Sequence, residues 1–220
     1  MLKPFIQSDL HQIRVKKFIR MIAPLVPYIT VGMGLLVCHN AWVAILSYHL
    51  VMLAVISTSG KRLSFFQIFK GGDKIRLPLL AAVGIGGGLL LWFLKPWVLL
   101  TGEMKVFTQS LGLTQQSWPL FITYFILVSP ALEEIYWRSF LGDPSTKLVL
   151  NDFLFSGYHM IVLAGIVQVA WLVVIFLVLA AAAWIWRLAN RLGGGLMSSF
   201  ISHLAADISI ILVSYFLVIR

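Results

Sequence analysis

Residues 118–140 read WPLFITYFILVSPALEEIYWRSF, and this stretch decides how the chain is expected to fold. It is an apolar run of membrane-spanning length that ends in two adjacent carboxylates, Glu133 and Glu134, with Arg138 one helical turn later. A charge in or beside hydrocarbon costs at least about 2.5–3.5 kcal/mol per group. Ionisable side chains at such a position therefore constitute a functional hypothesis by default.

The whole chain is far more apolar than a soluble domain. Of its 220 residues 60% are hydrophobic and only 11% are charged, and the mean hydropathy is +0.94. Ordinary globular domains contain about 45–50% apolar residues. Because the apolar runs are continuous and not alternating, they favour helices over a β-barrel. The composition predicts an all-α integral membrane protein, a polytopic transmembrane helical bundle with a single transmembrane domain over residues 21–220.

About seven spans are expected, with six to eight compatible with the pattern. They lie near residues 21–38, 41–57, 77–94, 118–140, 153–186 (two short helices joined by a tight turn near 168–171) and 196–219. Before the first span, residues 1–20 alternate basic and apolar side chains, which predicts an amphipathic segment on the lipid surface.

The net charge of +9 is gathered in a few clusters. Lysines and arginines concentrate in residues 3–20, 61–76 and 187–191, between apolar runs. By the positive-inside rule these clusters predict cytoplasmic loops and a cytoplasmic N-terminus in a multi-pass protein, with membrane lipids as partners. In a membrane protein such a basic balance does not indicate nucleic acid as a partner.

Two local features of the apolar runs predict helix geometry. The glycine-rich segment Gly84–Gly88 lies inside an apolar helix and lacks the Lys-Ser/Thr that follows a phosphate-binding loop, so it predicts close helix packing. Pro130 lies three residues before Glu133, removes one backbone donor and crowds the carbonyl of Ile126. A kink just before the acidic pair is therefore expected.

The polar side chains of the apolar helices recur at a spacing of four residues. Glu134 and Arg138 face each other one turn apart and could neutralise one another, which leaves Glu133 without a local partner. Two further pairs share this spacing: Phe155 with His159, and His203 with Asp207.

The expected topology brings these pairs to a similar depth. Glu133 lies near the cytoplasmic end of its span, while His159 and His203 each lie about two turns from the cytoplasmic start of theirs. A glutamate and two histidines around a shared cavity can act as general bases on water. A histidine that donates a hydrogen bond can stabilise the oxyanion formed when water attacks a carbonyl.

Other interpretations of the same residues remain open at this point. The polar groups could form a purely structural network, or belong to a non-catalytic membrane protein that binds a peptide or lipid. A transporter could use them as a proton relay, although no inverted repeat is visible. A zinc site is also conceivable, with Glu133, His159, His203 and Asp207 as ligands, although the His-Glu-x-x-His spacing is absent.

Three motifs in order carry a resemblance to a known family. Glu-Glu-x-x-x-Arg at 133–138, Phe-x-x-x-His at 155–159 and His-x-x-x-Asp at 203–207 resemble the motifs of the CPBP family. This family comprises the CAAX prenyl proteases and bacteriocin-processing proteins, also called the Abi family. The resemblance covers roughly residues 118–217, and the preceding spans match only as generic membrane helices.

The resemblance implies an intramembrane glutamate-type endopeptidase that acts on a peptide or a lipidated-protein segment without a cofactor. It assigns water activation to Glu133 and His159 and the oxyanion site to His203 and Asp207. The supporting residues that it implies are Glu134, Arg138 and Phe155. The family often has Asn where this chain has Asp207, and an ionised aspartate cannot donate to an oxyanion, so Asp207 would instead orient His203. The resemblance is also compatible with a non-catalytic or immunity protein of the same fold.

Overall fold

The computed structural model describes residues 14–59, 65–100 and 103–219. Within these ranges the chain forms helices and loops, and the only strand-like feature is one isolated bridge between Leu99 and Val167. The predicted all-α bundle is confirmed.

Six helices are long and apolar enough to cross a membrane. They are Arg14–Val37, α3 (Ala41–Thr58), α4 (Arg76–Val98), Trp118–Phe140, α8 (Val169–Gly193) and α9 (Met197–Ile219). The first of them contains α2 (Val26–Gly32). The fourth consists of α6 (Trp118–Glu133) followed by the π-helical segment η4 (Glu134–Phe140). The bundle also contains α7 (Leu150–Leu163), whose 14 residues are fewer than the roughly 17–20 that a full span needs. With α7 the described helices of the bundle agree with the expected number of about seven.

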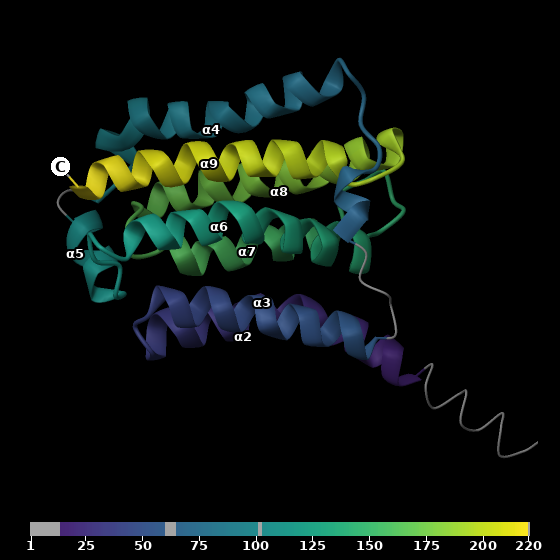
Figure 1. Ribbon diagram of the computed structural model, residues 1–220, viewed down its shortest axis with the longest axis horizontal. Helices are drawn as coiled ribbons and strands as arrows, with labels where there is room; N and C mark the ends of the chain where they lie inside the picture. Colours follow the sequence, from purple (N-terminus) through teal and green to yellow (C-terminus); the bar gives the residue numbers. More distant parts are fainter. Residues whose placement is uncertain (1–13, 60–64, 101–102, 220) are drawn as a thin grey trace, which may run out of the picture.

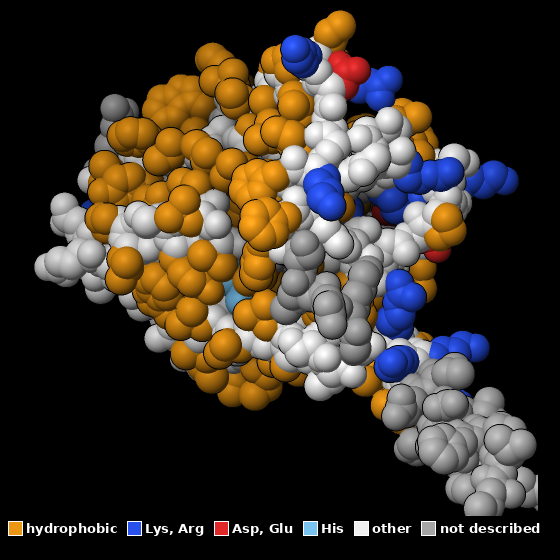
Figure 2. All heavy atoms as spheres, turned by 45° about the vertical axis from the view of Figure 1, so that its right-hand side comes forward, with side chains coloured by type: hydrophobic (Ala, Val, Ile, Leu, Met, Phe, Trp, Pro, Cys, Tyr) orange, Lys and Arg blue, Asp and Glu red, His pale blue; other side chains and the backbone are white. Residues whose placement is uncertain are grey.

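The outer faces of these helices are apolar. Phe93 on α4 is 70% exposed and Val169 on α8 is 79% exposed. Hydrophobic side chains cover a broad part of the face drawn in Figure 2, whereas lysines and arginines gather toward one end. Apolar surface on this scale is not presented to water by soluble monomers. The chain is an integral, multi-pass membrane protein.

The first span begins earlier than the sequence suggested. Residues 1–13 of the expected amphipathic segment lie outside the described residues, whereas Arg14–Arg20 continue directly into the first span. The described part stays helical through the turn Ala23–Leu25, and its position on the lipid surface remains a prediction. The Arg20 guanidinium donates to the carbonyl of Phe140 at 2.7 Å, so the start of the first span is joined to the end of η4.

The helices form layers in which α6 and α9 lie centrally (Figure 1). The hairpin of α2 and α3 covers one side, and α4 lies on the other side against α9. A Cβ atom on Gly84 would lie 2.3 Å from the carbonyl oxygen of Ser202, and one on Gly88 would lie 2.6 Å from Ser209. The predicted role of the glycine-rich segment in helix packing is confirmed, because only glycine allows this approach of α4 to α9.

The helix that carries the acidic pair changes geometry in the middle of that pair. It continues through Pro130, and the change from α to π geometry begins at Glu134. The backbone N–H of Leu141 bonds the carbonyl of Tyr136 at 2.8 Å, which is the wider spacing of a π turn. π-Helical segments are rare in proteins overall, and those that occur often lie at functional sites.

The long apolar run after residue 150 is divided as expected, but unequally. The break falls at residues 164–168, close to the predicted turn, and α7 is short. The second helix, α8, is not short, because it has 25 residues and includes Arg187 and Arg191. The prediction that these arginines lie in a loop is wrong. Gly194, at φ 72°, ends α8 in the left-handed conformation that glycine adopts without strain.

Candidate active site

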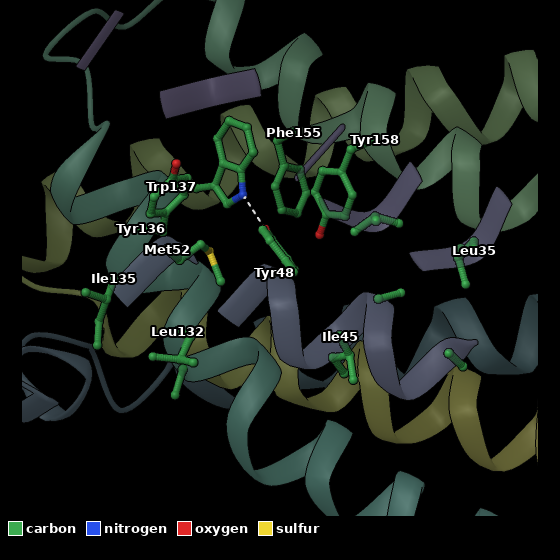
Figure 3. Packing of buried hydrophobic residues seen from close by; sticks show 14 of the residues in the cluster. Leu35, Ile45, Tyr48, Met52, Leu132, Ile135, Tyr136, Trp137, Phe155 and Tyr158 are labelled. Atoms are coloured by element: carbon green, nitrogen blue, oxygen red, sulfur yellow. Dashed lines mark hydrogen bonds between the residues drawn. The ribbon is translucent and has the colours of Figure 1, made fainter. Parts of the chain in front are cut away.

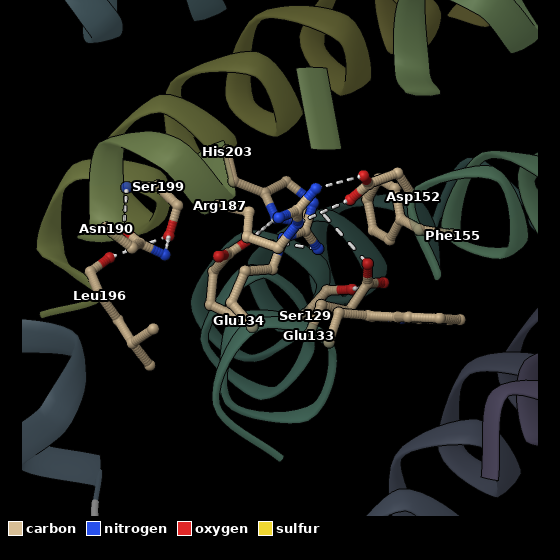
Figure 4. A network of polar contacts seen from close by, with 12 residues as sticks. Ser129, Glu133, Glu134, Asp152, Phe155, Arg187, Asn190, Leu196, Ser199 and His203 are labelled. Carbon is tan, nitrogen blue, oxygen red and sulfur yellow. Dashed lines mark hydrogen bonds and ion pairs between the residues drawn. The ribbon is translucent and has the colours of Figure 1, made fainter. Parts of the chain in front are cut away.

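A buried cluster of ionisable side chains lies where α6, η4, α7 and α9 meet (Figure 4). Glu133 is 5% exposed, Glu134 is fully buried and His203 is 4% exposed. The two glutamates come from the junction of α6 with η4, and the histidine comes from the second turn of α9. The structure therefore brings together the first and third sequence motifs.

Glu133 is held by hydroxyl groups from two helices. The Tyr158 hydroxyl donates to its Oε2 at 2.7 Å, and the Ser129 hydroxyl donates to its Oε1 at 3.3 Å. Ser129 lies one turn earlier on the same helix, so the expectation that Glu133 has no local partner is wrong. Its Oε2 lies 4.0 Å from Nε2 of His203, which is longer than a hydrogen bond.

Glu134 contacts the same histidine from the other side. Its Oε1 lies 2.9 Å from Nδ1 of His203 and 3.5 Å from Nη1 of Arg138. The imidazole is therefore a closer partner than the arginine that the sequence spacing indicated. An ionised carboxylate can only accept a hydrogen bond, so Nδ1 of His203 carries a proton in this contact.

Asp207 completes the surroundings of His203. Its Oδ1 lies 3.6 Å from Nε2 of His203, the nitrogen that also faces Glu133. Its side chain is 15% exposed, and its Oδ2 has no hydrogen-bond partner among the described residues. The three carboxylates thus surround one imidazole, with both ring nitrogens directed at acidic oxygens.

His159 belongs to the aromatic side of the cluster. Its Nδ1 donates to the carbonyl of Phe155 at 2.8 Å, because a carbonyl can only accept, and Nε2 is left as the second ring nitrogen. Its ring lies 4.1 Å from that of Tyr158 and 4.8 Å from that of Phe155, measured between centroids. Within the described part of the chain, no hydrogen bond or ion pair joins His159 to Glu133.

Aromatic rings enclose the charged groups. The guanidinium carbon of Arg138 lies 4.0 Å from the centroid of Phe155 and 5.0 Å from that of Trp186. Trp186 also stacks on His203 with centroids 4.7 Å apart. Cation–π contacts of this kind stabilise a desolvated cation. The Nη atoms of Arg138 nevertheless have no hydrogen-bond partner among the residues that are described.

A second layer connects the cluster to the N-terminal half. The indole N–H of Trp137 donates to the hydroxyl of Tyr48 on α3 at 3.1 Å, and the Tyr48 ring lies 5.5 Å from that of Tyr158 (Figure 3). The α2–α3 hairpin, which the sequence identified only as generic spans, therefore packs against the residue that holds Glu133.

Sequence reasoning missed three residues of this site. Ser129 was detectable, because it precedes Glu133 by the same four residues that paired Glu134 with Arg138. Tyr158 and Trp186 carry no local signal, since aromatic residues are common throughout apolar helices. Only the packing of α7 and α8 on η4 and α9 gives these two side chains their roles.

A separate buried ion pair lies nearby. Arg187 on α8 donates to both carboxylate oxygens of Asp152 on α7, at 3.2 and 2.7 Å. The same guanidinium also donates to the backbone carbonyls of Ser145 and Lys147. Asp152 Oδ2 in turn accepts from the N–H of Val149, so this pair fixes the loop before α7 to the end of α8.

The donor groups do not assemble into a metal site. Among the described residues, no three His, Cys, Asp or Glu side chains are placed to hold one metal ion. The four ligands considered for zinc are instead divided between the carboxylates that surround His203 and the aromatic surroundings of His159.

Comparisons of the chain with protein-family models, with curated proteins and with solved structures give no match. What the cluster can do follows from its chemistry. A buried carboxylate with one firm hydroxyl donor, facing an imidazole nitrogen across 4.0 Å, can exchange protons with a group placed between them. A polar contact of that length is longer than a direct hydrogen bond, and it is the kind of contact at which a water can bridge two groups once they separate slightly.

Proposed function

We propose that this chain is an intramembrane endopeptidase of the glutamate type, of the kind that the resemblance to the CPBP family implies. One observation carries the proposal. Glu133 is held in the bundle by Tyr158 and faces a histidine whose other nitrogen is fixed by Glu134. A base and a hydrogen-bond donor on opposite sides of one small space are what water addition to an amide requires.

In the proposed reaction, a water between Glu133 and His203 loses a proton to the Glu133 carboxylate. Its oxygen attacks the carbonyl carbon of the peptide bond, and the carbonyl oxygen becomes an oxyanion. Nε2 of His203 donates to this oxyanion while Nδ1 remains bonded to Glu134. Collapse of the tetrahedral intermediate breaks the C–N bond, and the proton held by Glu133 passes to the leaving amine.

The remaining polar residues have distinct roles in this scheme. Donation from both ring nitrogens requires an imidazolium, and the three carboxylates around His203 favour that charge. Asp207, whose Oδ1 lies 3.6 Å from Nε2, favours the imidazolium through its charge and is not itself a donor. His159, with Nδ1 bonded to Phe155, presents Nε2 as the second group that can orient the water. No cofactor takes part.

Substrate access requires movement, because Glu133 and His203 are almost completely buried. The class of substrate that we propose is a peptide or a lipidated-protein segment at the basic end of the bundle. Figure 2 shows lysines and arginines of the described residues gathered toward that end, which supports a cytoplasmic placement for it and for the N-terminus.

The orientation can be tested with the natural cysteine. Cys38 is exposed, is the only cysteine in the sequence and follows the end of the first span that lies away from Arg14. In intact cells a membrane-impermeant maleimide should label it from the outside. Labelling only after the membrane is permeabilised would reverse the proposed orientation.

Proteolysis is tested by incubating the purified protein in detergent with a peptide library and identifying products by mass spectrometry. Wild-type protein should give defined cleavage products with or without a chelator, and Glu133→Gln should give them at a rate lowered at least about 10²-fold. Equal rates for the wild-type protein and the variant would assign the cleavage to a contaminant. Loss of cleavage on adding chelator would replace the proposed mechanism with a metal-dependent one.

A second candidate is a non-catalytic membrane binding or immunity protein of the same fold. The burial of the cluster favours its immunity form, in which the glutamates and His203 hold the bundle together and need not reach a ligand. If Glu133→Ala and His159→Ala both preserve the biological effect of the protein, this second function is the correct one.

A further inference from the structure

A cavity of about 560 Å³ opens at the basic end of the bundle, outside the buried glutamate–histidine cluster. It lies between the segment after η3 (Phe65–Phe69), the end of η4 and the end of α8. Four of its lining residues are cations: Lys70, Arg138, Arg187 and Arg191. A single acidic residue, Asp143, lines it as well. The balance of charge in the lining therefore favours an anion.

Not all of these cations are free to bind a ligand. Arg187 is occupied by Asp152 and two backbone carbonyls, and one Nη of Arg191 donates to the carbonyl of Pro144. Lys70 is exposed and forms no ion pair among the described residues. The groups of the cavity that remain available to an anion are therefore the Lys70 ammonium and the part of the Arg191 guanidinium that does not contact Pro144.

Arg138 adds a buried positive charge to the lining of the cavity. Its side chain is 4% exposed, and neither Nη atom has a hydrogen-bond partner among the described residues. Glu134, 3.5 Å away, balances part of its charge but lies beyond hydrogen-bond length. Buried guanidinium donors without partners are uncommon in folded proteins and call for an explanation.

The wall that carries Lys70 and the residues after Arg191 is closely packed. A Cβ atom on Gly195 would lie 2.1 Å from the carbonyl oxygen of Lys70, and one on Gly71 would lie 2.6 Å from that of Gly193. The two loops therefore meet backbone to backbone. This contact holds the backbone of Lys70 against the end of α8, which carries Arg191, so the two side chains start from fixed positions before any ligand binds.

We propose that this cavity binds a phosphate group, supplied by an anionic lipid headgroup or by a free phosphate ester. Its volume lies within the range of about 300–1,000 Å³ that small-ligand sites have. Basic pockets between helices on the positively charged side of a membrane protein suit lipid phosphates. The accessible cations Lys70 and Arg191, with the buried charge of Arg138 behind them, favour a phosphate, which can carry two negative charges, over a carboxylate, which carries one. The proposal does not rest on the proposed peptidase reaction, although Arg138 also forms the ion pair with Glu134.

The test compares two double variants of the full-length protein. Lys70→Gln with Arg191→Gln removes the available charge from the cavity. Lys74→Gln with Lys147→Gln removes two exposed charges from residues that do not line it. Binding of inorganic phosphate is measured in detergent by calorimetry, with acetate at equal ionic strength as the carboxylate probe. Binding to vesicles of phosphatidylcholine is measured with and without phosphatidic acid.

We expect the cavity variant to lose about tenfold or more in affinity for the phosphate probes, and the control variant to retain wild-type affinity. Binding of inorganic phosphate alone would support a free ester as the source, and binding only to phosphatidic acid vesicles would support a lipid headgroup. Equal affinities of the two double variants, or tighter binding of acetate than of phosphate, would overturn the proposal. Glu133→Gln should bind phosphate normally, so a failed peptidase assay leaves this test intact.

Discussion

Two groups of buried charge are held in opposite ways. Asp152 and Arg187 satisfy each other at 2.7 Å and use their remaining donors and acceptors on the backbone. The groups around His203 are joined by longer contacts, at 3.5–4.0 Å for three of the four ion pairs there. Atoms of Glu134, Arg138 and Asp207 have no hydrogen-bond partner among the described residues.

The difference between the two groups indicates that the Asp152–Arg187 pair has a structural role and the cluster around His203 a chemical one. A satisfied buried pair contributes to the stability and specificity of packing, and nothing in it is left to act on another molecule. A buried cluster with unused atoms is costly in free energy, and a catalytic role is one of the explanations for such groups in folded proteins. The contrast predicts that the first pair matters for folding and the second for activity.

The largest expected effect is on hydrolysis. Glu133→Gln removes the proposed general base and should lower the peptide cleavage rate about 10²–10⁴-fold, while the yield of folded protein stays unchanged. The rate is measured on purified protein with the best peptide from the library. Asp73→Asn, an acid-to-amide change at an exposed position, is the control. If the yield of folded protein fell in parallel with the cleavage rate, Glu133 would be a structural residue like Asp152 and Arg187.

The next largest effect is on stability. Asp152→Ala leaves the Arg187 guanidinium buried without its carboxylate, which should cost about 3–5 kcal/mol of unfolding free energy. Thermal unfolding in detergent measures the loss, with the exposed change Lys147→Ala as the control. Cleavage per folded molecule should remain near that of the wild type. A variant that is stable yet inactive would show that this pair also belongs to the reactive site.

Glu134 is expected to have both a catalytic and a structural role, because it bonds His203 and also neutralises Arg138. Glu134→Gln keeps the shape of the side chain but removes its charge, so both hydrolysis and stability should fall, the latter by about 1–3 kcal/mol. The two quantities are measured on the same preparation. If this variant and Glu133→Gln have the same yield and the same activity, the two carboxylates do not divide the work in the proposed way.

The smallest effect is expected for the hydroxyl that orients the base. Tyr158→Phe removes the 2.7 Å hydrogen bond to Glu133 and should lower kcat about five- to tenfold, with KM and the unfolding temperature little changed. Tyr28→Phe removes a hydroxyl that bonds the carbonyl of Leu154 and leaves Glu133 untouched, so it is the matched control. Equal kcat values for these two variants would exclude Tyr158 as a positioning residue.

Much of the fold was predictable because it follows from local rules. Apolar runs of spanning length predicted most of the membrane-spanning helices, and the glycines of Gly84–Gly88 predicted the close helix packing that α4 makes with α9. The extent of α8 was not predictable in this way. Arg187 resembles the end of a span in the sequence, and its charge is tolerated in the helix because Asp152, 35 positions away, meets it.

The ionisable residues of the candidate site were predictable, but its aromatic residues and its contacts were not. Spacing identified Glu133, Glu134, His203 and Asp207, and the structure brings these four together. Spacing also paired Glu134 with Arg138, whereas its closest partner comes from α9. Tertiary contacts such as that of Tyr158 with Glu133 depend on how α7 packs against the helix that carries the acidic pair. The periodicity of residues within one helix does not predict the orientation of that helix relative to another.

The π geometry of η4 has a consequence for variation in chain length. A π turn holds more residues than an α turn, so Glu134–Phe140 in effect contains an inserted residue. The insertion is absorbed locally, and the contact of Arg20 with Phe140 follows it. A homologue one residue shorter here would form an uninterrupted α-helix and could pack in the same bundle, but its acidic pair and arginine would lose their present spacing. The length of this segment, and not only the identity of its residues, would then distinguish a chain with this site from one without it.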